Sequence, residues 1–314
     1  IMPIIAGIGE VDSAEPSHAM WRLSRLDPDA AEFRDGFDAF LYEYGSRGPN
    51  EWESRSPTWE TRPALALAAI DRMRHAPEAA NPASHHADRA AEREAASAEL
   101  LAMVAADPAT HGQLAAAIAC SKAWLPGRER TKTNNIRLIH EMRMPMREIG
   151  RRMAEIGAFD EIEDFGFVRA AEMPQLFADP HSLTETVRSR RDEYNRLGEL
   201  EPPFVFVGEP SPPSEWGRRD AVAANQLAAG DTLAGMPGCP GSAEGIAKVV
   251  LDSNDPFALE PGDILIAPIT DPSWTPLFVP AAAVVVDVGA PLSHAIIVSR
   301  ELGIPCVPSI ADAT

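Results

Sequence analysis

The sequence changes character near residue 235, and this change limits the possible folds more than any other feature. From there on, short β-branched runs alternate with Gly and Pro: GIAKVVL (245–251), GDILIAP (262–268), AAAVVVDV (281–288) and IPCVPSI (304–310). Runs of this length, bounded by Gly and Pro, are typical of strands. A small mixed α/β domain is therefore predicted over residues 235–314.

The residues before this domain are predicted to be mostly helical. Residues 88–107 are dense in Ala, Glu, Arg and Leu and end just before a proline, and residues 135–157 carry apolar side chains at helical spacing. Pro145 within the second stretch should kink the helix or split it in two. Residues 202–213 hold five prolines, which is typical of a semi-stiff connection.

These features divide the chain into three predicted parts. A helical domain covers residues 1–220, a hinge covers 221–234, and the small domain covers 235–314. The predicted fold class is therefore α+β, with more than one domain. The chain opens on Ile1-Met2 and stops at Thr314, just after a predicted strand, so we expect it to be a fragment whose last domain is truncated.

The charge balance argues against some classes of partner. The chain has 28 basic and 47 acidic residues, a formal net charge of −19. Nucleic acids and anionic membranes favour clustered Lys and Arg, so neither is an expected partner. No apolar run approaches the roughly 20 residues of a membrane helix. Cys120, Cys239 and Cys306 are widely spaced without a CxxC pair, which favours free thiols in the cytoplasm.

One histidine near the end of the chain stands at a predicted turn from strand to helix. The valines at 284–286 end a predicted strand, and GAPL (289–292) cannot continue it. Ser293 is then a plausible N-cap for a short, largely buried helix, HAIIVSREL, which Gly303 would stop. His294 would lie beside unpaired backbone N–H groups at the positive end of the helix dipole, which is an anion site. Its imidazole could attack a phosphoryl group.

The residues alone leave other interpretations of His294 open. An isolated histidine at a helix start can be an ordinary polar residue whose hydrogen bonds are satisfied. The neighbouring Ser293 suggests hydrolase chemistry, but adjacent residues do not form a triad and no GxSxG motif occurs. Metal binding would need further ligands, and none lies at regular spacing around the histidine.

Three motifs in this region, taken together, resemble those of a known family. GAPLSHAIIVSRELGIP (289–305) resembles the phosphohistidine signature of the phosphoenolpyruvate (PEP)-utilising enzymes, a group that includes PEP synthase, pyruvate phosphate dikinase and rifampin phosphotransferase. PGCPGSAEGIAKVV (237–250) resembles the opening of their swivelling β/β/α domain, and GDILIAPITDPSWTPLF (262–278) resembles its next strand and loop. The resemblance implies that His294 carries a phosphoryl group. It also implies that phosphate-supporting positions lie at Gly289, Ser293, Ala295 and Arg300.

The resemblance extends to the helical region. Residues 40–63 are similar to a Tyr-Gly-x-Arg…Glu…Trp-x-Glu-x-Pro stretch of the same enzymes, which makes Arg47 and Glu51 possible acceptor-domain residues. GRERTK (127–132) is similar to an element whose Arg and Lys meet the phosphate when the histidine domain docks. By that match Arg128 and Lys132 are catalytic, although both could equally belong to a solvated helix end.

Some positions depart from the family pattern. Leu292 stands where the family usually has a hydroxyl residue, Ile296 is bulkier than the usual residue, and Ser46 replaces a common histidine. No glycine-rich phosphate-binding loop is present; Gly7-Ile8-Gly9 is a weak match.

The resemblance implies a dikinase-type phosphotransferase. An ATP-grasp domain, expected before Ile1, would load the histidine from ATP and release AMP and orthophosphate. ATP and magnesium are expected in the full-length enzyme, whereas no cofactor or metal is expected on these residues. The small domain would then swing to an acceptor, either an apolar hydroxyl compound such as rifampin or pyruvate. The alternative is a non-catalytic phosphocarrier or binding subunit that serves a separately encoded ATP-grasp partner.

Overall fold

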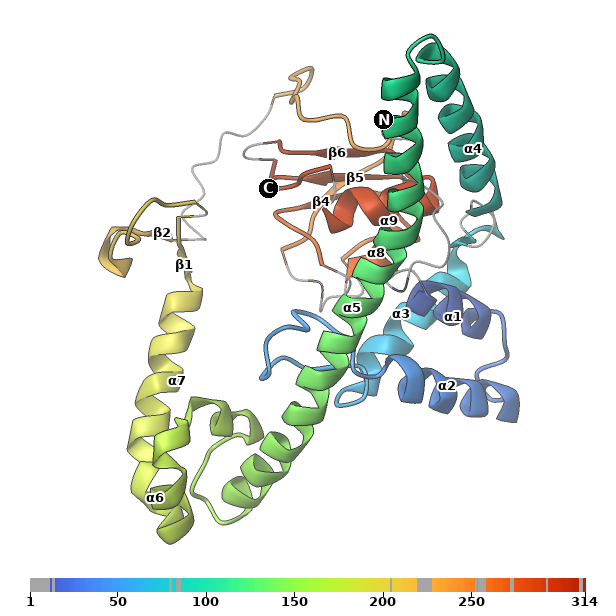
Figure 1. Ribbon diagram of the computed structural model, residues 1–314. Helices are drawn as coiled ribbons and strands as arrows, with labels where there is room; N and C mark the ends of the chain where they lie inside the picture. Colours follow the sequence, from blue (N-terminus) through green and yellow to red (C-terminus); the bar gives the residue numbers. More distant parts are fainter. Residues whose placement is uncertain are drawn as a thin grey trace. The chain divides into compact units, whose positions relative to one another are not determined.

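The chain packs into two compact units in the computed structural model (Figure 1), one formed by residues 1–139 with 233–314 and the other by residues 140–232. The structure describes residues 12, 15–78, 81–82, 86–203, 205–218, 228–251, 253, 258–271, 274–291, 293–310 and 313–314. Gly7-Ile8-Gly9, Leu292 and residues 221–227 of the predicted hinge lie outside these. The predicted boundaries at 220 and 234 stay predictions.

The first unit begins with helices. They are α1 (Glu15–Ser24), α2 (Ala31–Tyr44), α3 (Pro63–His75), α4 (His86–Met103) and the first part of α5 (Pro108–Glu155). Helix α1 contacts both α2 and α3, because its apolar face carries Met20 and Trp21, which are almost completely buried. Phe40 of α2 and Trp59 of the following loop belong to the same core, with ring centroids 5.4 Å apart and ring planes tilted by 37°. The helical N-terminal region predicted from the sequence is confirmed.

A parallel sheet completes the first unit. Its strands are β3 (Ala247–Val249), β4 (Ile264–Ala267), β5 (Ala283–Val286) and β6 (Cys306–Pro308), in that spatial order. All three neighbouring pairs are parallel, with Leu265 opposite Val284 and Val284 opposite Cys306. Each of the four β-branched runs contributes one strand, so these four predictions are confirmed.

Two helices connect these strands and cover the sheet. Helix α8 (Thr275–Phe278) lies between β4 and β5 in sequence, and α9 (His294–Leu302) lies between β5 and β6. The two helices contact one another; α8 also contacts α3, and α9 contacts α4, β5 and β6 (Figure 1). Phe278 and Ile296 are fully buried in this layer, and they belong to the same hydrophobic core as Met20 and Phe40. The bulk of Ile296 therefore serves the core.

Helix α9 has the predicted limits. Ser293 is its N-cap residue, with extended backbone angles, and Gly303 caps its other end. Gly303 has a φ of 70°, in the left-handed region where a side chain would be strained, and its N–H bonds to the carbonyl of Arg300. The helix is thus stopped where the sequence places a glycine.

The second unit has its own small core. It contains the end of α5, α6 (Met173–Ala178), α7 (Thr184–Gly198), and a two-residue antiparallel pairing of β1 (Leu200–Glu201) with β2 (Gly217–Arg218). Four short 3-10 helices lie between them: η4 (Ile162–Phe167), η5 (Ala170–Glu172), η6 (Pro180–Leu183) and η7 (Pro213–Glu215). The core residues are Ala158, Phe159, Phe165, Leu176, Leu183 and Val187.

Helix α5 corrects one expectation. It is one helix of 48 residues that continues through Pro145. Of the two predicted outcomes, a kink or a split, the split is wrong and the kink stays a prediction. A proline inside a helix removes one backbone hydrogen bond and crowds the preceding turn. Met146, Ile149 and Met153 follow Pro145 and pack against the core of the second unit. This packing offsets the local cost of the proline.

Candidate functional site

His294 stands at the carboxyl edge of the parallel sheet, as the first residue of α9. The chain leaves β5 at Val286 and turns sharply at Gly289 before reaching it. A Cβ added to Gly289 would lie 2.5 Å from the Cβ of Pro308 and 3.3 Å from Ser293 Oγ. Only glycine fits this close approach. Parallel sheets commonly place their sites at this edge, beyond the ends of the strands.

Two threonine hydroxyls hold the imidazole. Nε2 of His294 is 3.2 Å from Oγ1 of Thr275, at the start of α8, and Nδ1 is 3.3 Å from Oγ1 of Thr270, in the loop after β4. The Phe278 ring meets the imidazole edge-on, with centroids 5.8 Å apart and planes at 78°. His294 as a whole residue is partly exposed, whereas Thr275 is buried. The contacts with the two threonines and Phe278 fix the ring plane.

The surroundings of the ring keep it neutral. Burial lowers the pKa of His294 well below its ordinary value, and the positive charges of Lys132 and Arg47 lower it further. A neutral imidazole has one nitrogen with an available lone pair. The ring can therefore act as a nucleophile at neutral pH.

Three charged side chains of the helical region form a group that we call the Arg47–Glu51–Lys132 cluster. Arg47 Nε donates a hydrogen bond of 2.7 Å to Glu51 Oε2, and Lys132 Nζ lies 3.9 Å from Glu51 Oε1. Arg47 Nη1 also donates to Oγ1 of Thr133 on α5, at 3.2 Å. The cluster thus joins the loop between α2 and α3 to the middle of α5.

The charges in the cluster influence one another. Burial raises the pKa of Glu51, while Arg47 and Lys132 act in the opposite direction. Burial lowers the pKa of Lys132, and Glu51 opposes that change most strongly. Asp271, which follows Thr270 in the loop after β4, raises the pKa of both groups. A carboxylate from the sheet region therefore also acts on the cluster.

The structure brings only some of the predicted residues together. Arg47, Glu51 and Lys132 form one cluster, and the two cations act on His294. The side chain of Arg128 is about half exposed, at 52%, and its guanidinium pairs with neighbouring Glu129. This pairing does not support the catalytic role predicted for Arg128, which stays a prediction.

The residues predicted to support the phosphate have different surroundings in the structure. Arg300 is buried, and its guanidinium donates to the carbonyl of Gly238 at 3.3 Å, which is a structural contact. Ala295 is buried in the first turn of α9. The Oγ atom of Ser293 is buried without a hydrogen-bond partner among the described residues. Phosphate support at all four positions, Gly289 included, stays a prediction.

The sequence interpretation missed Thr270, Thr275 and Asp271. All three lie in the motif ITDPSWTP, which was recognised as a loop without any side chain being assigned a role. Two threonines and an aspartate after a predicted strand were the available signal. The approach of the two threonines to His294 depends on the pairing of β4 with β5, which places the two loops at one edge.

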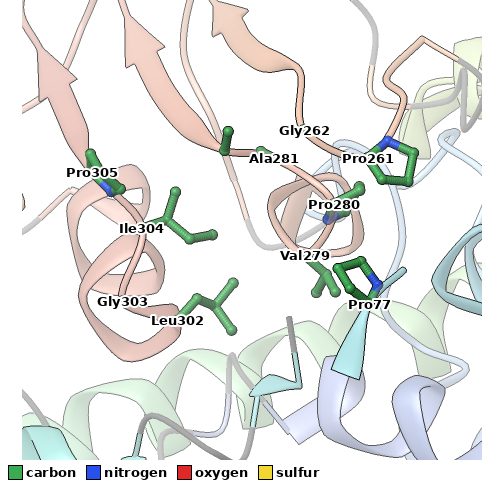
Figure 2. A pocket seen from close by; sticks show the side chains of 11 residues that line it. Pro77, Pro261, Gly262, Val279, Pro280, Ala281, Leu302, Gly303, Ile304 and Pro305 are labelled. Carbon is green, nitrogen blue, oxygen red and sulfur yellow. The ribbon is translucent and has the colours of Figure 1, made fainter. Parts of the chain in front are cut away.

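A pocket lies at the edge of the sheet opposite to His294. It is a cavity of about 540 Å³ lined by apolar side chains and glycines, including Pro77, Val279 and Leu302 (Figure 2). Gly262 and Pro305 in its wall come just before β4 and β6, so the cavity is at the amino edge of the strands. His294 follows the carboxyl edge. A molecule in this cavity therefore cannot accept a group directly from the imidazole.

Two further findings concern metal and membrane binding. Within the described parts of the chain, no three His, Cys, Asp or Glu side chains come close enough to share a metal ion. Among the helices of those parts, none combines the length and hydropathy of a bilayer span.

Comparison with protein families gives two matches within this chain. Residues 14–129 match the fourth domain of rifampicin phosphotransferase, and residues 259–314 match the mobile domain of PEP-utilising enzymes. The first segment contains Arg47, Glu51 and Arg128, and the second contains His294. Lys132 lies just beyond the first segment.

Individual relatives cover nearly the whole chain. It is 30% identical over 319 residues to the rifampicin phosphotransferase of Streptomyces sviceus, a match that spans 100% of this chain and 35% of that protein. It is 35% identical over 303 residues to an uncharacterized protein of Mycobacterium tuberculosis, with 96% and 31% covered. It is 31% identical over 300 residues to the prodigiosin synthesizing transferase of Serratia marcescens, with 92% and 32% covered. The chain thus spans about a third of the length of these relatives.

Proposed function

This chain belongs to the rifampicin phosphotransferase-like family of PEP-utilising enzymes, and on that premise we propose that His294 receives a phosphoryl group and passes it to a small-molecule acceptor. One observation carries the proposal. The neutral imidazole of His294, a partly exposed residue at the start of α9, lies within the electrostatic influence of Lys132 and Arg47. Other family members are phosphotransferases by name.

The first step places the phosphoryl group on the ring. The lone pair of one imidazole nitrogen attacks phosphorus, the bond from phosphorus to the leaving oxygen breaks, and its electron pair departs with that oxygen. The ammonium of Lys132 offsets negative charge on the transferring oxygens. Ser293 Oγ, which has no hydrogen-bond partner within the described residues, can donate to the same oxygens. The backbone N–H groups at the start of α9 add positive potential.

The second step releases the phosphoryl group. A hydroxyl oxygen of the acceptor attacks phosphorus, the N–P bond breaks, and its electron pair returns to the imidazole nitrogen. The hydroxyl proton passes to the freed ring. In the arrangement that this structure describes, the ammonium of Lys132 offsets charge in the transition state of this transfer.

The family resemblance supports a proposal for the donor and the acceptor. We propose that ATP, with magnesium, supplies the phosphoryl group from an ATP-grasp nucleotide-binding domain or subunit and is converted to AMP and orthophosphate. The acceptor is an apolar hydroxyl compound such as rifampicin, in line with the name of the Streptomyces relative. The 540 Å³ cavity is not its site, because it lies at the opposite edge of the sheet from His294. The three free cysteines agree with a proposed cytoplasmic location.

The test determines which phosphate of ATP is transferred to His294. The protein in its natural length is incubated with ATP carrying ³²P at either the β or the γ position. We expect acid-labile label on His294 from the β position only, none in His294→Ala, and loss of label when rifampicin is added. Loss of label to pyruvate would correct the acceptor. Labelling only after addition of a separate ATP-grasp protein would favour the phosphocarrier alternative. Undiminished label in His294→Ala would overturn the proposal.

A further inference from the structure

Glu51 occupies a fixed position in the loop between α2 and α3. Backbone hydrogen bonds from Trp59 N–H to the Arg47 carbonyl (2.8 Å) and from Glu60 N–H to the Gly45 carbonyl (2.9 Å) close this loop on itself. The Glu51 side chain is completely buried. A carboxylate placed this way does not touch a substrate, so any effect on phosphoryl transfer must pass through its neighbours.

Its two oxygen atoms serve different cations. Oε2 accepts the 2.7 Å hydrogen bond from Arg47 Nε, and Oε1 lies 3.9 Å from Lys132 Nζ. Arg47 reaches the same turn of α5 from a second direction through its 3.2 Å hydrogen bond to Thr133, the residue after Lys132. The Glu51 carboxylate and the Arg47 guanidinium therefore hold in place the segment of α5 that carries Lys132.

The two cations differ in accessibility. The side chain of Arg47 is 4% exposed and is held by Glu51 and Thr133, whereas the side chain of Lys132 is 23% exposed. Both charges act on the His294 ring. Lys132 is therefore the more accessible of the two cations that act on the ring. Resting on the function proposed above, we infer that Glu51 is a positioning residue that holds Lys132, charged and correctly placed, beside His294.

The charges around Lys132 give this inference a measurable consequence. Glu51, Glu129 and Asp271 stabilise its positive charge, while burial and the positive charge of Arg47 oppose it. Among the carboxylates, Glu51 has the largest influence on the lysine pKa. Replacing Glu51 by a neutral residue of the same shape lowers that pKa further. Lys132 then loses its proton, and with it the ability to stabilise the phosphoryl group, at a lower pH.

The experiment measures a rate against pH. Phosphoramidate, a small phosphoryl donor, is used to phosphorylate His294 in the natural-length protein, and the initial rate is followed across the neutral and alkaline range. The ionisation of the donor is common to all variants, so differences between profiles belong to the protein. In Glu51→Gln we expect the alkaline decline to begin about one pH unit lower than in the unmodified protein. In Lys132→Met we expect a low rate at every pH, without the alkaline decline that loss of the lysine proton causes.

A second substitution and a control make the result specific. Glu51→Asp keeps the charge but withdraws it from Lys132 by one methylene, so its alkaline decline should fall between those of the unmodified protein and Glu51→Gln. Glu94 is the matched control: it accepts from Lys122, also on α5, at 2.8 Å on the surface. Glu94→Gln should leave the profile unchanged. If Glu51→Gln does not fold, the Asp variant alone carries the test.

Different outcomes would show whether the inference about Glu51 fails or the proposed function itself fails. A rate that falls equally at every pH in both Glu51 variants, with the alkaline decline unmoved, would mean that Glu51 only supports the fold, and would overturn the inference. If His294 of the unmodified protein is not phosphorylated at all, that result would instead count against the proposed function.

Discussion

At the scale of single residues, the site depends on which side chains surround one imidazole. The sequence identified His294, because a histidine between a glycine turn and an apolar helix is a local pattern. It did not identify Thr270 and Thr275 as its partners. Those contacts come from another segment of the chain, the loop after β4 and the start of α8, and they depend on the pairing of β4 with β5. Local patterns do not contain that information.

The threonine contacts give a prediction at this scale. In Thr275→Val the shape is kept, but the hydroxyl 3.2 Å from Nε2 is lost. One neutral hydrogen bond contributes about 1 kcal/mol, so phosphorylation of His294 should slow about fivefold through a less well fixed ring. Thr270→Val tests the contact to Nδ1 in the same way. Initial rates with phosphoramidate provide the measurement. Unchanged rates in both variants would show that the hydroxyls do not orient the ring.

At the scale of elements, the sheet region was largely predictable and the long helix was not. Strands β3 to β6 and the limits of α9 follow from β-branched runs and from Ser293 and Gly303, which are local signals. The predicted split at Pro145 failed, since Met146, Ile149 and Met153 pack against residues far along the chain. Tertiary packing therefore outweighed the local preference of a proline.

The turn into α9 gives a prediction for an element. Gly289→Ala would bring a Cβ within 2.5 Å of Pro308, so the loop before His294 must shift. Overpacking of this kind costs about 1–3 kcal/mol of unfolding free energy. Gly112→Ala on α5 is the matched control, because a Cβ there has nothing within 4 Å. Urea unfolding of the two variants should show a loss for Gly289→Ala only. Equal midpoints would contradict the close packing.

At the scale of the whole molecule, the candidate site joins segments that are distant in sequence. The chain carries a net charge of −19, yet two cations, Lys132 and Arg47, act on His294. The family resemblance predicted a lysine of α5 and an arginine near α2 as site residues. It also gave Glu51 as a possible site residue, but it did not indicate that Glu51 would lie between the two cations, or that Arg128 would be half exposed beside Glu129. Which face of α5 turns toward the sheet is decided by packing over the whole unit.

This arrangement predicts a large effect from one distant substitution. In Lys132→Met the positive charge beside His294 is lost, and removal of one such stabilising group typically slows transfer about 10²-fold. Lys122→Met is the control, since Lys122 pairs with Glu94 on the surface of the same helix. Single-turnover phosphorylation of both variants, with circular dichroism to verify folding, measures the difference. Similar rates for the two variants would remove Lys132 from the site.

The central claim is that the imidazole of His294 carries the phosphoryl group. The most direct measurement is site mapping by mass spectrometry. The natural-length protein is quenched in alkali during turnover with ATP, and the peptides are fragmented under conditions that preserve the N–P bond. We expect a phosphorylated peptide whose fragments assign the phosphate to His294. Phosphate found at another residue, with His294 unmodified during turnover, would contradict it.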